Sequence, residues 1–311
     1  MTETAPEELI AVDVHTHVLA STYRAGPEDQ ALQSLATVFG FDHVPTLPEM
    51  IDYYRARNMA FVTFTVDDIS RSGVEPPVGN LEILDIAKKH PDVVIPFASV
   101  DPNRGSAAVR IATELLDEHG ARGLKFHPSQ QQFYPNDRDH YPLYELLAER
   151  GLPALFHTGT TGVGRGQPGG GGIRLKYSNP IFVDDVAADF SELPIILAHP
   201  SFPWQEEALA VATHKPQVYI DLSGWSPKYF PPVLVQHIKT LLKDRMLFGS
   251  DFPLITPERW IRDFDTLGVT PEVRSLVLKD NAMRLFDLSD LLDARRAQRA
   301  EEALSGRRPG D

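Results

Sequence analysis

The chain has 311 residues, of which 42% are hydrophobic and 23% charged, so it holds enough apolar material for a large globular core. A formal net charge of −13 at pH 7 argues against a nucleic-acid partner and an anionic membrane surface. It does not exclude an anionic substrate, because the local charge of a site can oppose the global one. The sequence has no cysteine, which excludes disulfides and thiolate metal ligands.

The N-terminus lacks the features of a targeting segment. Residues 1–8 are polar and acidic, without the basic and then apolar profile of a signal peptide. No apolar run approaches the roughly 20 residues that a membrane span requires. We therefore expect a cytoplasmic protein with a polar arm over residues 1–8, one folded domain over residues 9–293 and a charged, disordered tail over residues 294–311.

The first strand is predicted from the short apolar run Leu9 to Val14, which is rich in branched residues and ends in His15 and His17. Residues two apart on an extended backbone point to the same side. Both imidazoles can therefore face one point just beyond the strand, as a pair of metal ligands requires. A chance pair of loop histidines is the alternative, but three later strand-like runs that also end in His or Asp favour the metal pair.

Strand and helix patterns alternate along the rest of the chain. Seven further strands are expected, over residues 60–66, 93–100, 123–128, 153–157, 194–199, 218–222 and 246–251. Helices are expected over residues 48–57, 80–89, 106–119, 142–150, 181–190, 204–213, 231–242 and 257–267, with a further short helix around residues 31–39.

Eight strand–helix units predict an α/β fold with a parallel sheet and right-handed crossovers. They close most simply into a single-domain (β/α)₈ barrel, whose active site lies at the C-terminal ends of the strands. An open doubly wound sheet is the alternative. The barrel accounts better for the strand-end residues, because it places them all at one mouth: His15, His17, His157, His199 and Asp251.

Several motifs at the strand ends carry a family resemblance. They are His15-Thr16-His17, Gly123 to Pro128, Phe156 to Gly159, Leu197 to Pro200, Gly249 to Pro253 and the tail Asp280 to Phe286. Together they resemble the amidohydrolase superfamily, and within it the amidohydrolase-related branch that contains aminocarboxymuconate-semialdehyde decarboxylase. The resemblance runs from His15 to about Phe286, which is nearly the whole folded chain.

The resemblance implies a set of metal ligands, carried over by position: His15, His17, His157 and Asp251. It implies one divalent ion, zinc by preference and manganese as an alternative, and nitrogen and oxygen ligands suit this choice. Asp251 would also manage the proton of a metal-activated water. His199 matches a histidine that is a catalytic group in some members and an additional ligand in others; as a catalytic group it would polarise a substrate carbonyl.

Lys125 has two interpretations. Binuclear members of the superfamily carry a carboxylated lysine on strand four that bridges two metals, and Lys125 lies on the fourth expected strand. The decarboxylase-like branch is mononuclear, so a lysine there fits better as a contact for a substrate anion. We expect one metal, with Lys125 and His127 as substrate-binding or supporting groups.

Two loops offer further substrate contacts. Residues 162–172 are dominated by glycine and are expected to form a mobile lid, with an anion cradle as the alternative. Arg174 follows this loop and is a candidate for binding an acidic substrate, although exposed basic residues are usually only solvated. Trp225 follows the seventh strand, where it would line an aromatic pocket or an oligomer contact.

The expected function is that of a metal-dependent hydrolase that attacks a carbonyl-containing acid or thioester, including aromatic and β-ketoacyl compounds, with metal-activated water. The alternative is a metal-dependent, non-oxidative decarboxylase (a carboxy-lyase) of an aromatic or muconate-type acid. The long glycine-rich loop favours the hydrolase, because it suggests an extended substrate that needs a lid. The expected partner is a small anionic molecule, and a homodimer is compatible with this group. A metal-free binding protein is disfavoured because every expected catalytic position is filled.

Overall fold

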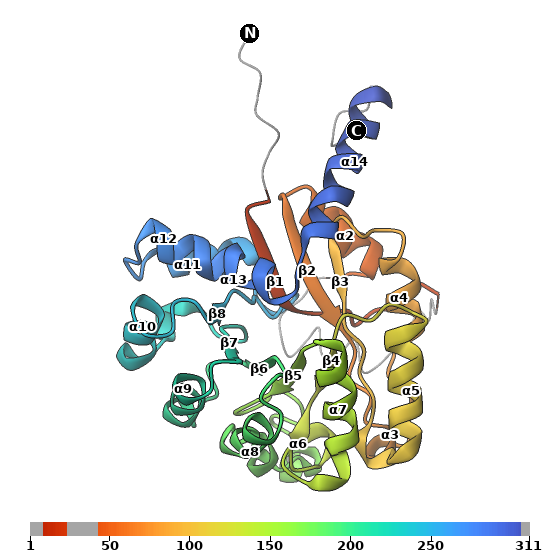
Figure 1. Ribbon diagram of the computed structural model, residues 1–311, viewed down its shortest axis with the longest axis vertical. Coiled ribbons are helices and arrows are strands. Elements are labelled where there is room, and N and C mark those ends of the chain that lie inside the picture. Colours follow the sequence, from red (N-terminus) through yellow and green to blue (C-terminus); the bar gives the residue numbers. More distant parts are fainter. Residues whose placement is uncertain (1–8, 24–42, 306–311) are drawn as a thin grey trace.

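The computed structural model describes residues 9–23 and 43–305, so the expected polar arm and the expected helix around residues 31–39 lie outside the described residues. Eight parallel strands form the centre of the molecule (Figure 1). They are β1 (Ala11–His17), β2 (Met59–Phe64), β3 (Val94–Pro96), β4 (Leu124–Phe126), β5 (Ala154–His157), β6 (Ile195–Ala198), β7 (Val218–Asp221) and β8 (Met246–Leu247).

Helices surround these strands (Figure 1). The helices are α2 (Leu47–Arg55), α3 (Ile69–Ser72), α4 (Asn80–Ala87), α5 (Ser106–Asp117), α6 (Pro128–Gln131), α7 (Tyr141–Arg150), α8 (Ile181–Asp189), α9 (Gln205–His214), α10 (Pro232–Lys239), α11 (Pro257–Asp265), α12 (Pro271–Ser275), α13 (Asn281–Leu285) and α14 (Ser289–Ser305). Short 3₁₀ segments lie between them: η1 (Pro102–Arg104), η2 (Arg138–His140), η3 (Pro168–Gly172), η4 (Leu175–Ser178) and η5 (Pro227–Tyr229), while η6 (Leu276–Asp280) is a π-helical turn.

Backbone hydrogen bonds close the strands into a barrel. Strands β1 to β3 pair in sequence order, as do β4 to β8. The first seam lies between β3 and β4, where the Lys125 N–H donates to the Ala98 carbonyl at 2.7 Å. The second seam joins the segment after β8 to β1. Here the Val14 N–H donates to the Phe248 carbonyl at 2.9 Å, and the His17 N–H donates to the Phe252 carbonyl at 2.8 Å. The predicted (β/α)₈ barrel is confirmed.

The strands are buried on both faces, as their near-continuous apolar sequences require. One apolar cluster fills the space between the strands and the helices, and includes Phe126 of β4 and Phe156 of β5. A second cluster fills the barrel interior, where Val14, Phe64 and Leu155 lie. Because apolar side chains fill this interior, the polar side chains that face inward lie at the C-terminal ends of the strands.

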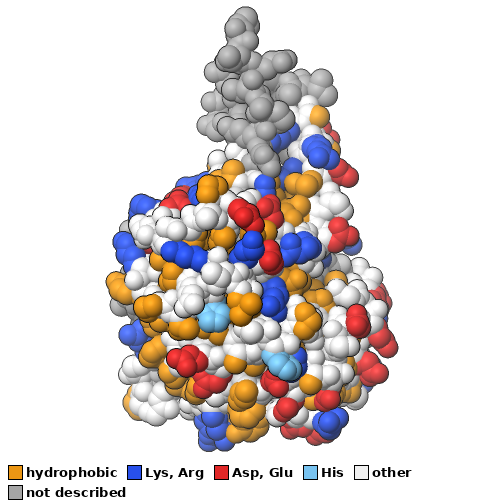
Figure 2. Space-filling model, turned by 60° about the vertical axis from the view of Figure 1, so that its left-hand side comes forward, with side chains coloured by type: hydrophobic (Ala, Val, Ile, Leu, Met, Phe, Trp, Pro, Cys, Tyr) orange, Lys and Arg blue, Asp and Glu red, His pale blue; other side chains and the backbone are white. Residues whose placement is uncertain are grey.

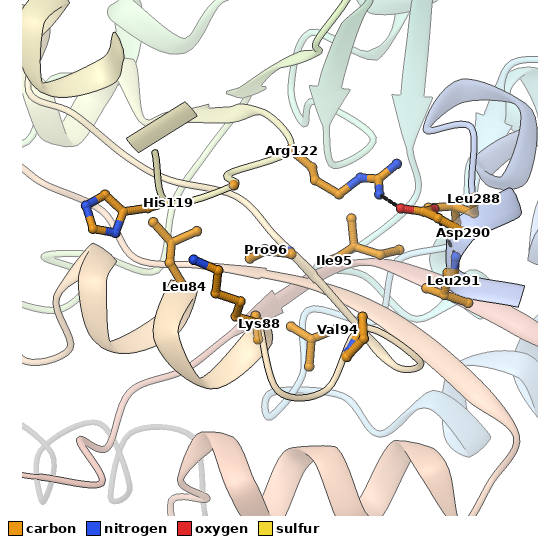
Figure 3. Close-up of a pocket in the computed structure, with 13 residues that line it drawn as sticks. Leu84, Lys88, Val94, Ile95, Pro96, His119, Arg122, Leu288, Asp290 and Leu291 are labelled. Atoms are coloured by element: carbon orange, nitrogen blue, oxygen red, sulfur yellow. Dashed lines mark hydrogen bonds and ion pairs between the residues drawn. The ribbon is translucent and has the colours of Figure 1, made fainter. Parts of the chain in front are cut away.

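Helix α14 leads away from the barrel and carries the chain to Ser305 (Figure 1). Residues 294–305 of the expected disordered tail are therefore helical. The reason is a buried anchor: Arg295 is only 6% exposed, and its guanidinium donates to the Asp92 carbonyl at 3.1 Å. Near the start of the same helix, Asp290 pairs with Arg122 beside a groove of about 170 Å³ (Figure 3). This groove lies at the N-terminal ends of β3 and β4, opposite the polar strand ends.

The surface charge is mixed where it can be seen. Figure 2 shows acidic and basic side chains interspersed on one face, so the acidic excess does not gather there into a single patch. Among the helices that the structure describes, none is long and apolar enough to cross a membrane.

Candidate metal centre

A β-bulge in β1 aims its two histidines into the barrel. The pairing of β1 with β2 shifts by one residue between Asp13 and Thr16. Val14 packs in the interior cluster, and the bulge lets the next residue, His15, face the interior as well, with its ring 4.9 Å from Phe64. Residue His17 then falls on the same side as His15, as the spacing predicted.

Three donor atoms converge at the mouth of the barrel. They belong to His15, His17 and Asp251, and lie within 4.8 Å of one another. Asp251 Oδ1 is 3.0 Å from Nε2 of His17 and 3.5 Å from Nε2 of His15. Within residues 9–23 and 43–305, Nε2 of His15 is buried and has no hydrogen-bond partner.

This donor set fits a divalent cation. Two imidazoles and one carboxylate are ligands that Zn²⁺ accepts, and three protein ligands leave a coordination position free. A buried ring nitrogen without a partner is otherwise unfavourable, and a cation would satisfy it. The residues present could therefore hold a divalent metal ion, as the sequence led us to expect.

Asp221, which was not predicted from the sequence, contacts the ring nitrogen of His15 on the side opposite the three donors. Its Oδ2 accepts a hydrogen bond from Nδ1 of His15 at 2.6 Å, so the lone pair of His15 lies on Nε2, toward the converging donors. Burial raises the pKa of Asp221, against hydrogen bonds from Ser223 and the charge of Lys125. A cation on His15 would favour the ionised carboxylate. The available signal was its position at the end of the seventh strand, equivalent to that of His157 on the fifth.

His157 lies next to His199 and is not one of the three converging donors. Its Nδ1 is 3.0 Å from Nε2 of His199, and its Nε2 is 3.2 Å from the Thr160 carbonyl oxygen. The ring of His199 is 4.8 Å from that of His15 and completes the cluster of imidazoles. The structure thus brings all five predicted strand-end residues to one mouth of the barrel. The donor atoms of three of them, His15, His17 and Asp251, lie within 4.8 Å of one another.

Two of these residues have strained backbones. His199 has φ +74° and Asp251 has φ +65°, in the left-handed region that non-glycine residues rarely adopt. Such conformations cost about 1–3 kcal/mol each and cluster at functional sites. Here the turn after each strand directs a side chain inward over the barrel mouth.

Burial sets the charge state of the centre. It lowers the pKa of His15 and of His157 well below the ordinary value, and lowers that of His199 to about 4. All three imidazoles are therefore neutral near pH 7, as metal ligands must be. Burial alone would raise the pKa of Asp251, but His17 and the charges of His199 and Lys125 lower it below its usual range. The carboxylate is thus ionised.

Lys125 is fully buried in the barrel interior. Its Nζ has no hydrogen-bond partner in the described part of the chain and lies 4.6 Å above the ring centre of Phe64. Burial lowers its pKa to about 7, against the opposing charges of Asp221 and Asp251. A buried amine without a partner is costly, so this residue is available to a ligand.

His127 lies at the same end of the barrel, next to His157. Its ring stacks on that of His157 at 3.8 Å, and the Gln130 N–H donates to its Nδ1 at 3.3 Å. Its Nε2 therefore carries the hydrogen and faces the Thr161 hydroxyl at 3.4 Å, at the start of the glycine-rich loop. His127 and Lys125 are both placed at the centre, as expected.

The structure does not bring the two loop candidates to the centre. Arg174 is exposed, directly before η4. Trp225 is half-buried and packs against Phe202, with ring centres 5.6 Å apart. Both follow strand ends, but neither makes a described contact with the imidazole cluster, so their roles as substrate residues stay predictions.

Comparisons with known proteins agree with this geometry. The sequence profile described as amidohydrolase matches residues 12–288. Among curated proteins, a stretch of 113 residues is 26% identical to Protein fluG of Emericella nidulans, and this match covers 35% of the chain but only 12% of that protein.

Solved structures share the barrel. An uncharacterized TIM-barrel protein of Bordetella bronchiseptica is 24% identical with a TM-score of 0.71, covering 90% of this chain and 99% of that one. The 5-carboxyvanillate decarboxylase of Sphingomonas paucimobilis is 14% identical with a TM-score of 0.62, covering 90% and 99%. A candidate 2-pyrone-4,6-dicarboxylic acid hydrolase of Acinetobacter baumannii is 17% identical with a TM-score of 0.54, covering 89% and 99%.

The family match extends over most of the chain and includes both histidines of β1, the strand ends with His157 and His199, and Asp251. The resemblance inferred from the strand-end motifs is therefore confirmed. The chain belongs to the amidohydrolase family.

Proposed function

We propose that the protein is a metal-dependent hydrolase that acts on a carbonyl-containing acid or thioester. The observation that carries this proposal is the convergence of His15 Nε2, His17 Nε2 and Asp251 Oδ1, with the nitrogen of His15 left without a partner among the described residues. We further propose His157 as the fourth ligand, because its ring lies 4.7 Å from that of His199, which in turn lies 4.8 Å from that of His15.

A bound divalent ion such as Zn²⁺ would supply Lewis acidity toward a substrate carbonyl and toward water. The residues of the chain would transfer protons and orient the substrate. Asp251 is ionised and positioned at the mouth, so it can accept a proton and return it to a leaving group. His199 is neutral and its ring lies 4.8 Å from that of His15, so we propose it as a second catalytic group that can accept a proton next to the three donors.

Lys125 is the residue that points to an anionic substrate. Its amine has no hydrogen-bond partner in the described chain, and the two carboxylates whose charges act on it, Asp221 and Asp251, are engaged with His15 and His17. A carboxylate of the substrate would satisfy this group inside a water-poor cavity, where a charge-assisted hydrogen bond is strong.

The same observation favours a second candidate, a non-oxidative decarboxylase of an aromatic or muconate-type acid. A substrate carboxylate held at Lys125 would be buried, and losing that charge as CO₂ is favoured in a site that excludes water. The decarboxylase of Sphingomonas paucimobilis shows that the fold supports this chemistry, but at 14% identity it does not choose between the two.

A product assay separates the two candidates. Purified protein loaded with Zn²⁺ would be incubated in H₂¹⁸O with aromatic acids, β-ketoacids and their thioesters, and both ¹⁸O in the products and released CO₂ would be measured. The hydrolase predicts ¹⁸O incorporation that depends on the metal. CO₂ release without ¹⁸O incorporation would replace it with the decarboxylase.

A further inference from the structure

One buried carboxylate links the two strand ends that carry the three converging donors. Asp13 lies in β1 and is fully buried. Its Oδ1 accepts hydrogen bonds from two backbone N–H groups, from that of His15 at 3.2 Å and from that of Ser250 at 2.9 Å. His15 is one of the three donors, and Ser250 directly precedes Asp251, which is another. One oxygen atom therefore holds the backbone of β1 and the backbone of the turn after β8.

The second oxygen of this carboxylate shows on which face of β1 the side chain lies. Oδ2 accepts hydrogen bonds from the Tyr54 hydroxyl at 2.7 Å and from the Ser250 hydroxyl. Tyr54 belongs to α2 and to the apolar cluster between the strands and the helices. The ring of His15 lies on the opposite, inner face of β1, against Phe64. Asp13 therefore reaches the metal centre through the backbone and not as a ligand.

The two backbone segments that Asp13 joins are both irregular. In β1 the pairing with β2 shifts between Asp13 and Thr16, and the His15 N–H donates to the side chain two residues before it. After β8, Asp251 has φ +65°, a strained conformation for a residue with a side chain. The Asp251 N–H donates to the His15 carbonyl at 2.9 Å, so the two segments also contact each other directly. Strained backbone persists only where surrounding contacts hold it, and Asp13 supplies such contacts to both segments.

The loss of Oδ1 would release both segments. Buried N–H groups require an acceptor, so those of His15 and Ser250 would have to turn elsewhere or remain unpaired. The side chains of His15 and Asp251 would move with their backbone, whereas a binding site must be held within about 0.5 Å of its working geometry. An amide oxygen at the same place would accept from the two N–H groups as the carboxylate oxygen does. The contact thus requires an acceptor oxygen, and it does not require a negative charge.

We propose that Asp13 is a positioning residue of the metal centre. It fixes the backbone of His15 and of the turn that carries Asp251, so that both side chains reach the same ion. This inference rests on the proposed function for its metal. It differs from the role of Asp221, which acts on the ring of His15 itself.

Two variants separate the acceptor oxygen from the charge. Zn²⁺ affinity of the full chain is measured by competition with a chelating dye, and circular dichroism checks the fold. Asp13→Ala removes the acceptor, so we expect the affinity to fall by about 10-fold, within the usual effect of losing a group that supports metal ligands. Asp13→Asn keeps an oxygen for the two N–H groups, and its NH₂ can donate to the Tyr54 and Ser250 hydroxyls. We expect this variant to bind Zn²⁺ with the affinity of wild type.

Tyr54→Phe is the matched control. It removes one hydrogen bond to Oδ2 of Asp13 from a fully buried ring and leaves both contacts of Oδ1 in place. We expect the urea midpoint of unfolding to fall while the Zn²⁺ affinity of the folded chain stays unchanged. If Asp13 served stability alone, Asp13→Ala would behave in the same way as this control.

Wild-type Zn²⁺ affinity in a folded Asp13→Ala variant would overturn the inference, and so would a folded Asp13→Asn that binds as weakly as Asp13→Ala. If Asp13→Ala does not fold, Asp13→Ser replaces it in the same comparison, because a serine hydroxyl lies one bond closer to the main chain and withdraws from Ser250. A failure of the proposed function gives a different result, namely a wild-type chain that binds no Zn²⁺, and it would overturn this inference as well.

Discussion

Asp221 and His15 form a buried pair in which a carboxylate oxygen and a ring nitrogen are 2.6 Å apart. The contact fixes the orientation of the imidazole and directs its Nε2 lone pair to the converging donors. It also raises the basicity of the ring as a ligand. The carboxylate of Asp221 would therefore act on a metal ion through His15, the ring that lies between them.

Replacing this carboxylate by an amide tests the pair. Asp221→Asn keeps the shape but removes the charge, so we expect Zn²⁺ affinity to fall by about 10–100-fold, measured by competition with a chelating dye. Circular dichroism should show the same secondary structure as wild type. Wild-type affinity in a folded variant would mean that His15 does not bind the metal.

The three convergent donors should be required for metal retention. His17→Ala and Asp251→Ala each remove a ligand atom, so each should reduce bound zinc from one equivalent to a small fraction, as measured by mass spectrometry of the metal. His214→Ala, an exposed histidine at the end of α9, is the control and should keep one equivalent. Full zinc occupancy in Asp251→Ala would remove this residue from the site.

The strand-end residues could be predicted because the barrel constrains them. Parallel strands place their C-terminal ends at one mouth, so His15, His17, His157, His199 and Asp251 had to lie near each other once the eight units were recognised. Periodicity alone does not show that Asp221 faces inward, because both faces of a barrel strand are buried. The β-bulge that aims His15 inward depends on pairing with β2 and has no local sequence signal.

Loop residues were harder to predict for a related reason. Arg174 and Trp225 follow strand ends, but the length of a loop does not determine where its side chains lie. His140 is another example: it is only 7% exposed, with its ring 4.9 Å from that of Phe133. The short η2 turn places this side chain in the interior, and no hydrophobic pattern in the sequence predicts its burial.

Lys125 should be essential for substrate binding, but it should lower the free energy of unfolding of the protein. Lys125→Met fills a similar volume without a buried amine, so we expect the free energy of unfolding to rise by about 1–3 kcal/mol while KM increases strongly. Denaturant unfolding and kinetics measure the two effects. Lys239→Met, at an exposed position, should change neither.

Metal content of the same variant tests the one-metal interpretation. Lys125→Met should keep one equivalent of zinc, because Lys125 is not among the convergent donors. A wild-type protein with two equivalents, both lost in the variant, would instead indicate a carboxylated, bridging lysine.

His199 should contribute mainly to the chemical step. His199→Asn removes an imidazole whose ring lies 4.8 Å from that of His15, so we expect kcat to fall about 10²–10⁴-fold, the usual range for one acid–base group, while the metal is retained. Equal losses in kcat and kcat/KM would place its contribution in the transition state. A purified variant that lacks metal and regains activity with excess Zn²⁺ would show that His199 is a ligand.

The stability of the fold should depend on His140 at acidic pH. Burial lowers its pKa in the folded state, so the unfolded chain, with a pKa near 6.5, binds the proton more readily. The contribution of this residue is therefore fully present above pH 6.5 and is lost as the pH falls below that value, by up to about 1.4 kcal/mol per pH unit. Between pH 7.5 and pH 5, His140→Gln should lose less unfolding free energy than wild type, because the variant lacks the contribution of His140 alone. The measurement is urea unfolding at both pH values, with the exposed His214→Gln as control. An identical acid sensitivity in wild type and His140→Gln would show that this histidine can be protonated without opening the fold.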